Sequence, residues 1–335
     1  MLIFDGHSDL LTDITLRRIN GERNVFKERH YPKLIKGGVN ALIAVVWIDP
    51  PYDSNPSARM MEIIKSGYAE LYPLNDVVFP VKNAGDLDLA IENNKIGIIL
   101  GMEGLSGLEN DPEALFFLYE LGLRHASLTW NEANGFATGV RSSSEIKGLT
   151  LAGKRAVKIM EELGIIIDVS HADERTFWDI IDMTNRPIIA SHSNVYNLCP
   201  EDRNLKDEQI RAIANSGGII GINSWHEFVD RGNPNLDKLV NHIDYLVNLA
   251  GVDHVAFGFD FTDFLDDTTV SSFKTGEFSA TLGINSAEEI PNIVKVLKDR
   301  GYNNEALEKI CFNNLRNLFK FITTKWNNLR GNYAL

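Results

Sequence analysis

The chain has 335 residues, of which 44% are hydrophobic and 24% charged, a composition typical of a soluble globular protein with one large α/β barrel or two ordinary domains. Its formal net charge is −13 and it has no cluster of Lys and Arg, which excludes nucleic acid as an expected partner, because phosphate binding requires such clusters. No run of about 18 apolar residues is present to span a bilayer, so a membrane partner is not expected either.

Eight short apolar runs alternate with amphipathic segments along the chain. Several runs are rich in Ile and Val without regular alternation of polar residues, which is typical of strands buried on both faces of a parallel sheet. We therefore predict strands at Leu2–Asp5, Val39–Trp47, Ile96–Met102, His125–Trp130, Ile165–Val169, Pro187–Ser191, Gly218–Asn223 and His254–Phe259.

The amphipathic segments between these runs predict helices. The segment that starts at residue 151 ends before Gly164, a natural helix stop, and Asp207 and Asn235 are predicted N-terminal caps. The predicted helices are Ala58–Leu71, Leu151–Leu163, Glu174–Met183, Asp207–Asn215, Leu236–Ala250, Ser286–Asp299 and Asn304–Phe321.

Eight strands that alternate with helices predict a single (β/α)8 TIM barrel with C-terminal helices, which we assign to residues 1–335 as one domain. The segment Phe261–Ile284 is rich in Thr, Ser, Gly and Asp, and we expect it to form a loop over the barrel mouth. A doubly wound sheet is the alternative architecture. It is disfavoured because no predicted strand leads into a G-x-G-x-x-G turn and no Gly-Lys-Ser/Thr phosphate loop occurs.

The two cysteines, Cys199 and Cys311, stand far apart and outside any CxxC motif. We expect both to be small apolar filling residues in a reducing compartment. The first residues contain no basic segment followed by an apolar run, so no signal peptide is expected. These observations predict a cytoplasmic protein.

Side chains that bind metals stand where several predicted strands end. The active sites of this barrel lie at the C-terminal ends of its strands, so catalytic residues are expected at these positions. His7 and Asp9 are two residues apart and therefore project from one face of a strand. Imidazole and carboxylate groups together form the ligand set expected for zinc, manganese or iron. The candidate residues are His7, Asp9, Glu103, His171, His192 and Asp260.

Without Asp260, five candidate ligands remain. They exceed the three protein groups that usually hold one catalytic zinc, but they suit two ions if one carboxylate bridges them. Glu103 is the expected bridge, since its strand lies between that of His7 and Asp9 and those of the two later histidines. Two ions about 3.5–4 Å apart lower the pKa of a shared water toward about 7, which produces a hydroxide nucleophile. Asp260 is then free to orient that water and to carry its proton to the leaving amine.

The other histidines have no assigned role in this centre. His30 and His242 are predicted to be loop and helix-surface residues. His125 and His254 each start a predicted strand, which places them at the end of the barrel away from catalysis. His226 follows the seventh predicted strand, where a side chain can line the site, but we assign it no function.

Seven segments form an ordered pattern from residue 5 to residue 319: DGHSD at 5–9, GMEG at 101–104, IDVSH at 167–171, ASHS at 190–193, DRNLKDEQI at 202–210, HVAFGFDF at 254–261 and the ending at 288–319. In this order they resemble the membrane dipeptidase (renal dipeptidase) family of zinc peptidases, within the amidohydrolase superfamily. The resemblance implies hydrolysis of dipeptides with a free C-terminal carboxylate by a centre of two zinc ions, with Mn²⁺ or Fe²⁺ as other candidate metals.

The same resemblance implies a role for each ligand. His7 and Asp9 would hold one ion, His171 and His192 would hold the other, and Glu103 would bridge the two. Members of the family are often dimers, so a homodimer is expected.

On the substrate side, Arg203 matches the family arginine that binds the free carboxylate of the dipeptide, and a guanidinium fork suits that contact. Asp260 matches the acid/base aspartate of the family. The other common bridge in the superfamily is a carboxylated lysine at the end of the fourth strand, where residues 128–131 read LTWN. The lack of a lysine there agrees with a glutamate bridge and argues against phosphotriesterase-like members.

The sequence departs from the family around the substrate. Trp130 and Asn131 stand where well-known members carry a histidine that polarises the scissile carbonyl, so either Asn131 donates a hydrogen bond in its place or the metal alone polarises the carbonyl. Residues 261–263 read FTD where members often have Phe-Asp-Gly, and Trp225 and Phe228 stand in a region that is usually rich in Tyr.

These departures leave two alternatives to a dipeptidase open. One is a related metal-dependent amidohydrolase that acts on N-acyl amino acids, lactams or lactones. The other is a barrel that has lost catalysis and serves as a binding protein. Every residue of the predicted metal set is present, which favours an enzyme.

Overall fold

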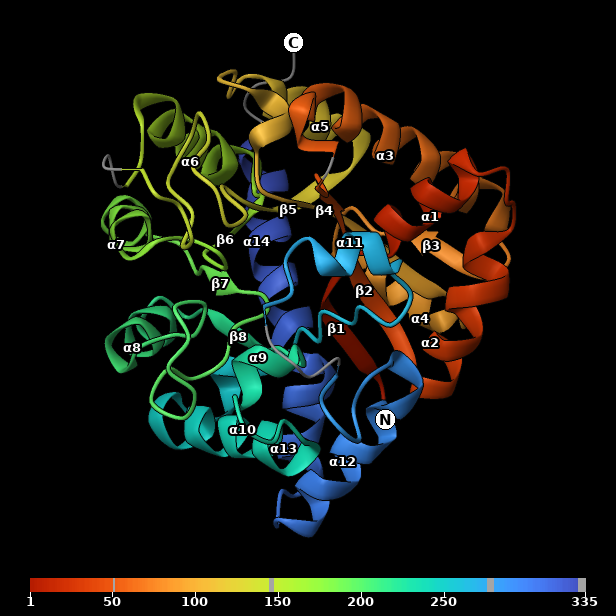
Figure 1. Cartoon of the computed structure of the whole chain (residues 1–335), viewed down its shortest axis with the longest axis vertical. Helices are drawn as coiled ribbons and strands as arrows, with labels where there is room; N and C mark the ends of the chain where they lie inside the picture. Colours follow the sequence, from red (N-terminus) through yellow and green to blue (C-terminus); the bar gives the residue numbers. More distant parts are fainter. Residues whose placement is uncertain (51, 145–147, 276–279, 331–335) are drawn as a thin grey trace.

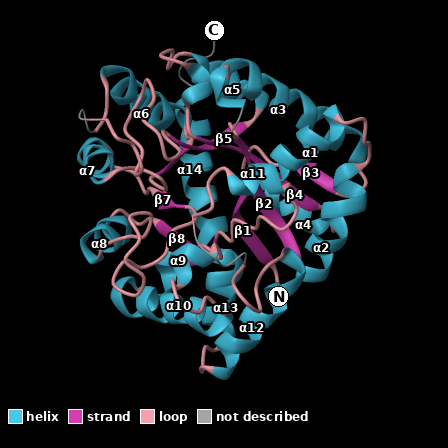
Figure 2. Cartoon of the chain, viewed as in Figure 1, coloured by secondary structure: helices cyan, strands magenta, loops and turns pink. Residues whose placement is uncertain are grey.

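The computed structural model describes residues 1–50, 52–144, 148–275 and 280–330. Its strands form one parallel sheet in the order β2-β1-β9-β8-β7-β6-β5-β4-β3, and an additional pairing of β2 with β4 closes all of them except β3 into a barrel (Figure 2). The strands are β1 (Ile3–Ser8), β2 (Val39–Trp47), β3 (Val78–Pro80), β4 (Ile96–Glu103), β5 (Leu123–Ser127), β6 (Ile166–Asp168), β7 (Ile189–Ala190), β8 (Ile219–Ile222) and β9 (Val255–Phe257).

The predicted barrel is confirmed, because each of the eight predicted runs contains or overlaps one barrel strand. Strand β3 was not predicted. It has three residues, ends in Pro80 and pairs only with the first residues of β4, Ile96 to Ile98. So short an edge strand has no repeating pattern that would distinguish it from a loop.

Helices surround the barrel, and Figure 1 shows helix α11 in front of the barrel strands, with helix α14 behind them. The helices are α1 (Leu10–Ile19), α2 (Tyr31–Gly37), α3 (Pro56–Leu71), α4 (Ala84–Glu92), α5 (Ala114–Leu121), α6 (Leu151–Leu163), α7 (Glu174–Met183), α8 (Asp207–Asn215), α9 (His226–Val229), α10 (Leu236–Ala250), α11 (Asp267–Ser271), α12 (Ile290–Asp299), α13 (Asn304–Glu308) and α14 (Asn314–Arg330).

The start of helix α14 closes one end of the barrel interior. Its residues Leu315 and Phe319 belong to the same buried cluster as the inward-facing strand residues Phe4 and Ile43. The ring of Phe312, just before the helix, lies 5.9 Å from the ring of Phe4. Because this end is filled with apolar side chains, the opposite end, where the parallel strands finish, is the one that is free to hold a site.

The segment predicted to cover that opposite end does so in its described part. Leu265 and Phe273 line a pocket together with Glu103 at the end of β4, and the segment contains the short helix α11. Residues 276–279 of the predicted loop lie outside the described residues. Among the helices that the structure describes, none is both long and apolar enough to cross a membrane.

The helix ends test the capping predictions. Gly164 ends α6 in a left-handed conformation with φ of 71°, and Asn235 caps α10 by accepting a hydrogen bond from the backbone N–H of Lys238, so both predictions are confirmed. The prediction for Asp207 is wrong by one residue. Asp207 is the first residue inside α8, and its carboxylate accepts a hydrogen bond from the hydroxyl of Tyr245 (2.9 Å).

Two histidine predictions are also wrong, because both side chains are buried. The ring of His30 pairs with Asp13 of helix α1 at 2.9 Å. His242 lies on the inner face of α10, where Nδ1 accepts from the backbone N–H of Val195 and Nε2–H donates to the carbonyl of Val229. Both rings satisfy groups that are distant in sequence, which helical spacing alone does not reveal. Cys199 and Cys311 are buried and unpaired, as predicted.

Candidate metal centre

The predicted ligands gather at the C-terminal rim of the barrel. His7 lies near the end of β1, Asp9 follows that strand directly, and Glu103 is the last residue of β4. His171 and His192 stand just after β6 and β7. Because all these strands run parallel, their ends meet at one rim, and the structure brings the five side chains together there, each of them buried.

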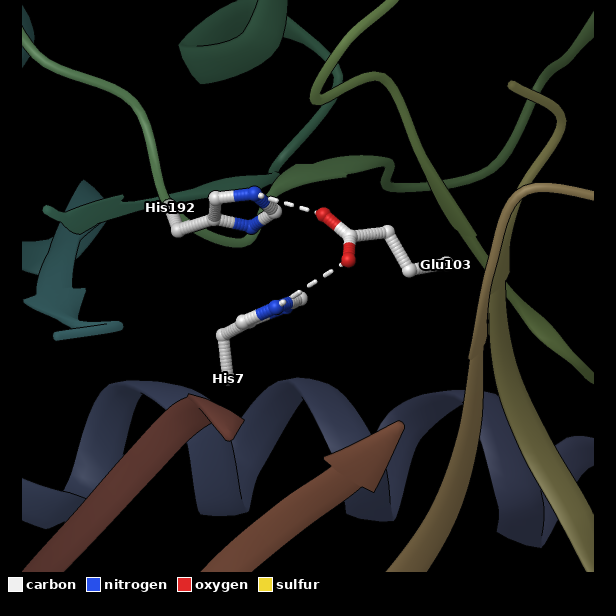
Figure 3. A group of neighbouring side chains, drawn as sticks. All are labelled: His7, Glu103 and His192. Atoms are coloured by element: carbon white, nitrogen blue, oxygen red, sulfur yellow. Dashed lines mark ion pairs between the residues drawn. The ribbon is translucent and has the colours of Figure 1, made fainter. Parts of the chain in front are cut away.

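Glu103 stands between the two halves of this group. Its Oε1 lies 2.8 Å from Nε2 of His171 and 3.3 Å from Nε2 of His192. Its Oε2 lies 3.7 Å from Nε2 of His7. Figure 3 shows the two carboxylate oxygens of Glu103 turned toward His192 on one side and His7 on the other. The carboxylate therefore has the position that a bridge between two cation sites requires.

The second half of the group forms around His7. Its Nε2 lies 3.6 Å from Oδ2 of Asp9 and 3.9 Å from Oδ1 of Asp260, which follows β9. In His7, Asp9 and Asp260, one ligand atom of each residue lies within 4.8 Å of those of the other two. A second such group consists of His7, Glu103 and His192. Both ring nitrogens of His7 lack a hydrogen-bond partner among the described residues, which is unusual for a buried imidazole.

Hydrogen bonds on the far side of two rings set their protonation. Nδ1–H of His171 donates to Oδ1 of Asn131 (2.9 Å). Nδ1–H of His192 donates to Oγ of Ser191 (2.6 Å), and the hydroxyl of Ser191 in turn donates to Asp168 (2.5 Å). With Nδ1 protonated in each ring, the neutral imidazole carries a lone pair on Nε2.

These two lone pairs face each other. The Nε2 atoms of His171 and His192 are 3.0 Å apart, and Oε1 of Glu103 is close to both. With both ring protons on the far sides, these three acceptor atoms repel one another unless a proton or a metal cation lies among them. The donor set, the fixed tautomers and the hydrogen-bonded outer partners are those of a metal site, so these residues fit a metal ion.

Burial also shifts the pKa values of the clustered side chains. Burial raises the pKa of the Glu103 carboxyl well above its ordinary range. Burial would lower the pKa of His7, but the negative charges of the surrounding carboxylates outweigh this effect and raise that pKa to about 10. Burial lowers the pKa of His171 and His192, so both rings are neutral. The carboxylates thus attract positive charge, and the two neutral imidazoles are ready to bind a cation.

Backbone strain accompanies the site. His171 has a φ of 67° and Asp260 a φ of 57°, a left-handed conformation that non-glycine residues rarely adopt. Such a residue costs on the order of 1–3 kcal/mol and persists where the surroundings fix it, often at functional sites. Both strained residues have their side chains in the candidate centre, next to Glu103 and His7.

The glycines beside Glu103 serve the backbone. Gly104 has a φ of 83°, and a Cβ there would lie 2.9 Å from the backbone N of Trp130. A Cβ on Gly101 would lie 2.7 Å from Nδ1 of His125, inside the barrel. The two glycines therefore leave room for the backbone at Trp130 and for the side chains of His125 and Ile43, and none of these close contacts involves the Glu103 carboxylate.

A pocket opens from the metal centre to the surface, with a volume of about 40 Å³. That is room for roughly two or three waters. Aromatic rings form much of its wall: Phe273 lies 5.6 Å from Trp47, 6.3 Å from Trp130 and 5.4 Å from Trp225, measured between ring centroids. Trp130 and Asn131, the predicted substrate-binding residues, both line the pocket. The lining residues are Asp9, Trp47, Glu103, Trp130, Asn131, Arg141, His171, Trp225, Phe228, Asp260, Thr262, Leu265 and Phe273.

Arg203 occupies a different place from the one its predicted role suggests. It is buried, and it lines a small cavity next to His171 instead of the pocket described above. Its guanidinium donates to Oγ of Ser193 (3.0 Å) and to the backbone carbonyl of His192 (3.2 Å). Its Nε–H has no hydrogen-bond partner among the described residues.

Several residues that shape the site were not singled out from the sequence. Asn223 donates from Nδ2 to Oδ2 of Asp260 (3.1 Å) and to the backbone carbonyl of His192 (3.3 Å). It ends the seventh predicted strand, so the rule that identified the other strand ends applies to it as well. Asp168, which fixes Ser191, stands one residue before the end of the fifth predicted strand, whereas Arg141, which lines the pocket, has no comparable signal.

His125 was predicted to lie at the end of the barrel away from catalysis, but hydrogen bonds connect it to the site. It lies within β5, fully buried, and its Nε2–H donates to Oδ2 of Asp168 (3.0 Å). Through Asp168 and Ser191 it joins the hydrogen bonds that orient His192. His226 is buried beside Trp225, at 4.3 Å between ring centroids, and lines a cavity with Asp260.

Comparisons with known proteins identify the family of the chain. The sequence model of a family described as membrane dipeptidase, peptidase family M19, matches residues 1–331. An uncharacterized protein from the pqqA 5′ region of Klebsiella pneumoniae is 34% identical over 249 residues, which cover 71% of this chain and 86% of that protein. An uncharacterized dipeptidase of Schizosaccharomyces pombe is 30% identical over 73% of this chain and 58% of its own length.

The fold is similar to solved metallopeptidases. A crystal structure of a metallopeptidase from Rhodobacter sphaeroides, bound to a phosphinate mimic of the dipeptide L-Ala-D-Ala, superposes with a TM-score of 0.83 at 22% sequence identity. The match covers 96% of this chain and 99% of that one, so the whole barrel with its C-terminal helices is shared.

Proposed function

The chain belongs to the membrane dipeptidase family and is a metal-dependent peptide hydrolase, and we propose that it hydrolyses dipeptides with a free C-terminal carboxylate at a centre of two zinc ions. The observation that carries the metal part is the pair of Nε2 lone pairs, on His171 and His192, that face each other beside Glu103. We further propose one catalytic domain over residues 1–335 and a homodimer.

Each half of the centre would take one ion. His7 and Asp9 supply one side, His171 and His192 supply the other, and Glu103 contributes one oxygen to each. When bound, such ions supply an activated water near neutral pH and stabilise negative charge on the scissile carbonyl. Manganese or iron would suit the same imidazole and carboxylate donors.

Asp260 is the proposed acid/base residue. Its Oδ1 faces the centre, 3.9 Å from Nε2 of His7, while its Oδ2 is held by Asn223. Burial raises the pKa of Asp260 to about 6, close to the range in which a carboxyl both accepts and returns a proton. The residue would take a proton from the attacking water and deliver it to the leaving amine.

Substrate entry requires movement at the pocket mouth. Pockets for small ligands commonly measure about 300–1,000 Å³, whereas the pocket over the centre measures about 40 Å³. The side chains of Leu265 and Phe273, from the segment that follows β9, line this pocket. They would move aside to admit a dipeptide and return to exclude water.

Chelation tests the proposal directly. We expect the purified protein to hydrolyse L-Ala-L-Ala or L-Ala-D-Ala, to lose this activity after chelation, and to regain it with added Zn²⁺. Metal analysis of the reconstituted protein should give two ions per chain. Equal turnover before and after thorough chelation would refute a metal mechanism, and a single ion at full activity would refute the binuclear centre.

The replacement Arg203→Met tests recognition of the C-terminal carboxylate. A charge-assisted pair contributes roughly 1.5–3 kcal/mol, so KM for dipeptides should rise about 10- to 100-fold, while dipeptide amides should change little. Steady-state kinetics on both substrates measure the difference. Because Arg203 is buried and bonded to Ser193, thermal unfolding and the Arg203→Lys variant serve as controls. Equal KM changes for acid and amide would remove Arg203 from this role.

One alternative substrate class is favoured by the pocket walls. The rings of Trp47, Trp130 and Trp225 stand around the mouth and would also suit the acyl chain of an N-acyl amino acid. A protein that turns over N-acetyl amino acids but no dipeptide would belong to this alternative, as would one that opens lactams or lactones.

A further inference from the structure

We propose that Arg141 is a specificity-determining residue that binds the side-chain carboxylate of the C-terminal residue, so that the preferred substrates are dipeptides ending in Asp or Glu. The inference rests on the proposed dipeptidase function and names its substrate class.

Arg141 lies in the wall of the catalytic pocket. It lines the same space as Glu103, His171 and Asp260, and its side chain is 34% exposed. Its backbone N–H donates to the carbonyl of Asn131 (3.0 Å), the residue whose side chain holds His171. The guanidinium is therefore attached close to the metal centre and still reaches the open part of the pocket.

The donors of this guanidinium are not saturated. It forms a long ion pair with Oε2 of Glu227 at 3.8 Å, a distance too great for a hydrogen bond. Oxygen atoms of Glu227 already accept from the backbone N–H (2.7 Å) and the hydroxyl (2.9 Å) of Thr275. Among the hydrogen bonds of the described residues, the Arg141 side chain donates none. A planar fork with free donors in a half-open pocket is suited to a carboxylate ligand.

The other residues of the pocket explain why a substrate with a side-chain carboxylate, in addition to its C-terminal carboxylate, would be preferred. Of the described side chains that line it, Arg141 is the cationic one, Asn131 and Thr262 are polar but neutral, and Trp47, Trp130, Trp225 and Phe273 offer ring surfaces for an apolar stem. The carboxylates of Asp9 and Asp260 lie beside His7, at the metal centre. A substrate carboxylate that projects away from the metals therefore finds one positively charged partner among these side chains.

Arg141 also lies on the side of the pocket where the C-terminal residue would sit. The guanidiniums of Arg141 and Arg203 both flank His171, since one lines the pocket and the other the cavity beside that ring. A residue with two carboxylates, one on its backbone end and one on its side chain, matches two neighbouring guanidiniums.

Kinetics on paired dipeptides test this proposal with the metal-loaded full chain. The substrates are Ala-Ala, Ala-Asp, Ala-Glu and Asp-Ala, with both L and D forms of the C-terminal residue. We expect the unmodified protein to prefer Ala-Asp or Ala-Glu. The replacement Arg141→Met should lower kcat/KM for Ala-Asp and Ala-Glu about 10- to 100-fold, mainly through a higher KM. It should change kcat/KM for Ala-Ala less than about 3-fold. Arg141→Lys should recover part of the loss.

Arg155→Met is the matched control, because Arg155 forms an ion pair with Glu113 on an exposed surface away from the pocket. This variant should leave kcat/KM unchanged for every substrate. Equal losses on Ala-Ala and Ala-Asp after Arg141→Met would overturn the proposal, and so would a loss confined to Asp-Ala or no preference for acidic dipeptides. If the metal-loaded unmodified protein hydrolyses no dipeptide at all, the proposed function itself fails. Hydrolysis of Ala-Ala without the acidic preference overturns only the role of Arg141.

Discussion

Replacing Glu103 with glutamine is expected to abolish tight metal binding and to lower kcat/KM by at least about 1,000-fold, because both halves of the centre lose a shared anionic ligand. Oε1 and Oε2 of Glu103 face different histidines, so no neighbouring carboxylate can take over both contacts. A neutral amide has the same shape but supplies neither the charge nor a second oxygen.

The fold should tolerate this replacement. Burial raises the pKa of Glu103 well above its ordinary range, which means that the buried negative charge is costly in the metal-free protein. Glu103→Gln removes that cost, so the metal-free variant should unfold at a temperature no lower than that of metal-free unmodified protein.

Metal content and unfolding temperature together measure the effect. Both proteins are stripped with a chelator, dialysed against zinc, and analysed for metal per chain. Glu162→Gln on the exposed face of helix α6 is the control and should bind metal and turn over substrate normally. A Glu103→Gln protein that keeps two ions and full activity would show that this residue is not the bridge.

Replacing Asp260 with asparagine is expected to lower kcat by about 100- to 10,000-fold, the usual contribution of a general acid or base, with little change in KM. Asparagine tolerates the left-handed φ of 57° at this position. Its side-chain oxygen can still accept the hydrogen bond from Asn223. The variant therefore removes proton transfer while it keeps the shape of the site.

Metal analysis separates catalysis from metal binding in this variant, because Oδ1 of Asp260 lies 3.9 Å from Nε2 of His7. Two ions with a lowered kcat would support an acid/base role. Loss of one ion would instead make Asp260 a ligand, and an unchanged kcat would exclude it from proton transfer. Asp253→Asn, in the short turn that precedes β9, is the matched control and should have no effect.

The barrel and the metal-binding residue types could be predicted from the sequence because both depend on local pattern. Buried parallel strands read as short apolar runs, and the order of runs and helices leaves few possible topologies. The ligands stand at the ends of these runs, so the parallel arrangement alone brings His7, Glu103 and His192 to one rim. The exception, β3, is three residues long and has too little pattern to detect.

The orientation of side chains depended on the tertiary structure. His30 and His242 are buried because their rings pair with groups from distant segments, and no spacing within the sequence encodes those partners. The tautomer of His171 is set by Asn131, which follows a different strand, and that of His192 by the adjacent Ser191, whose hydroxyl is held by the distant Asp168. The argument for a cation between the two rings rests on these contacts.

The residues that face the substrate also differ in whether the sequence or the tertiary structure identified them. Motif order in the sequence singled out Arg203, but the folded chain places Arg141 in the pocket wall and directs the Arg203 guanidinium toward Ser193. The aromatic wall around Phe273 likewise assembles from four separate segments. The sequence by itself determined the fold and the candidate metal-binding residues, because strand periodicity and strand-end position are local properties. Only the tertiary structure decided which charges and rings face the substrate, because that depends on how distant segments pack.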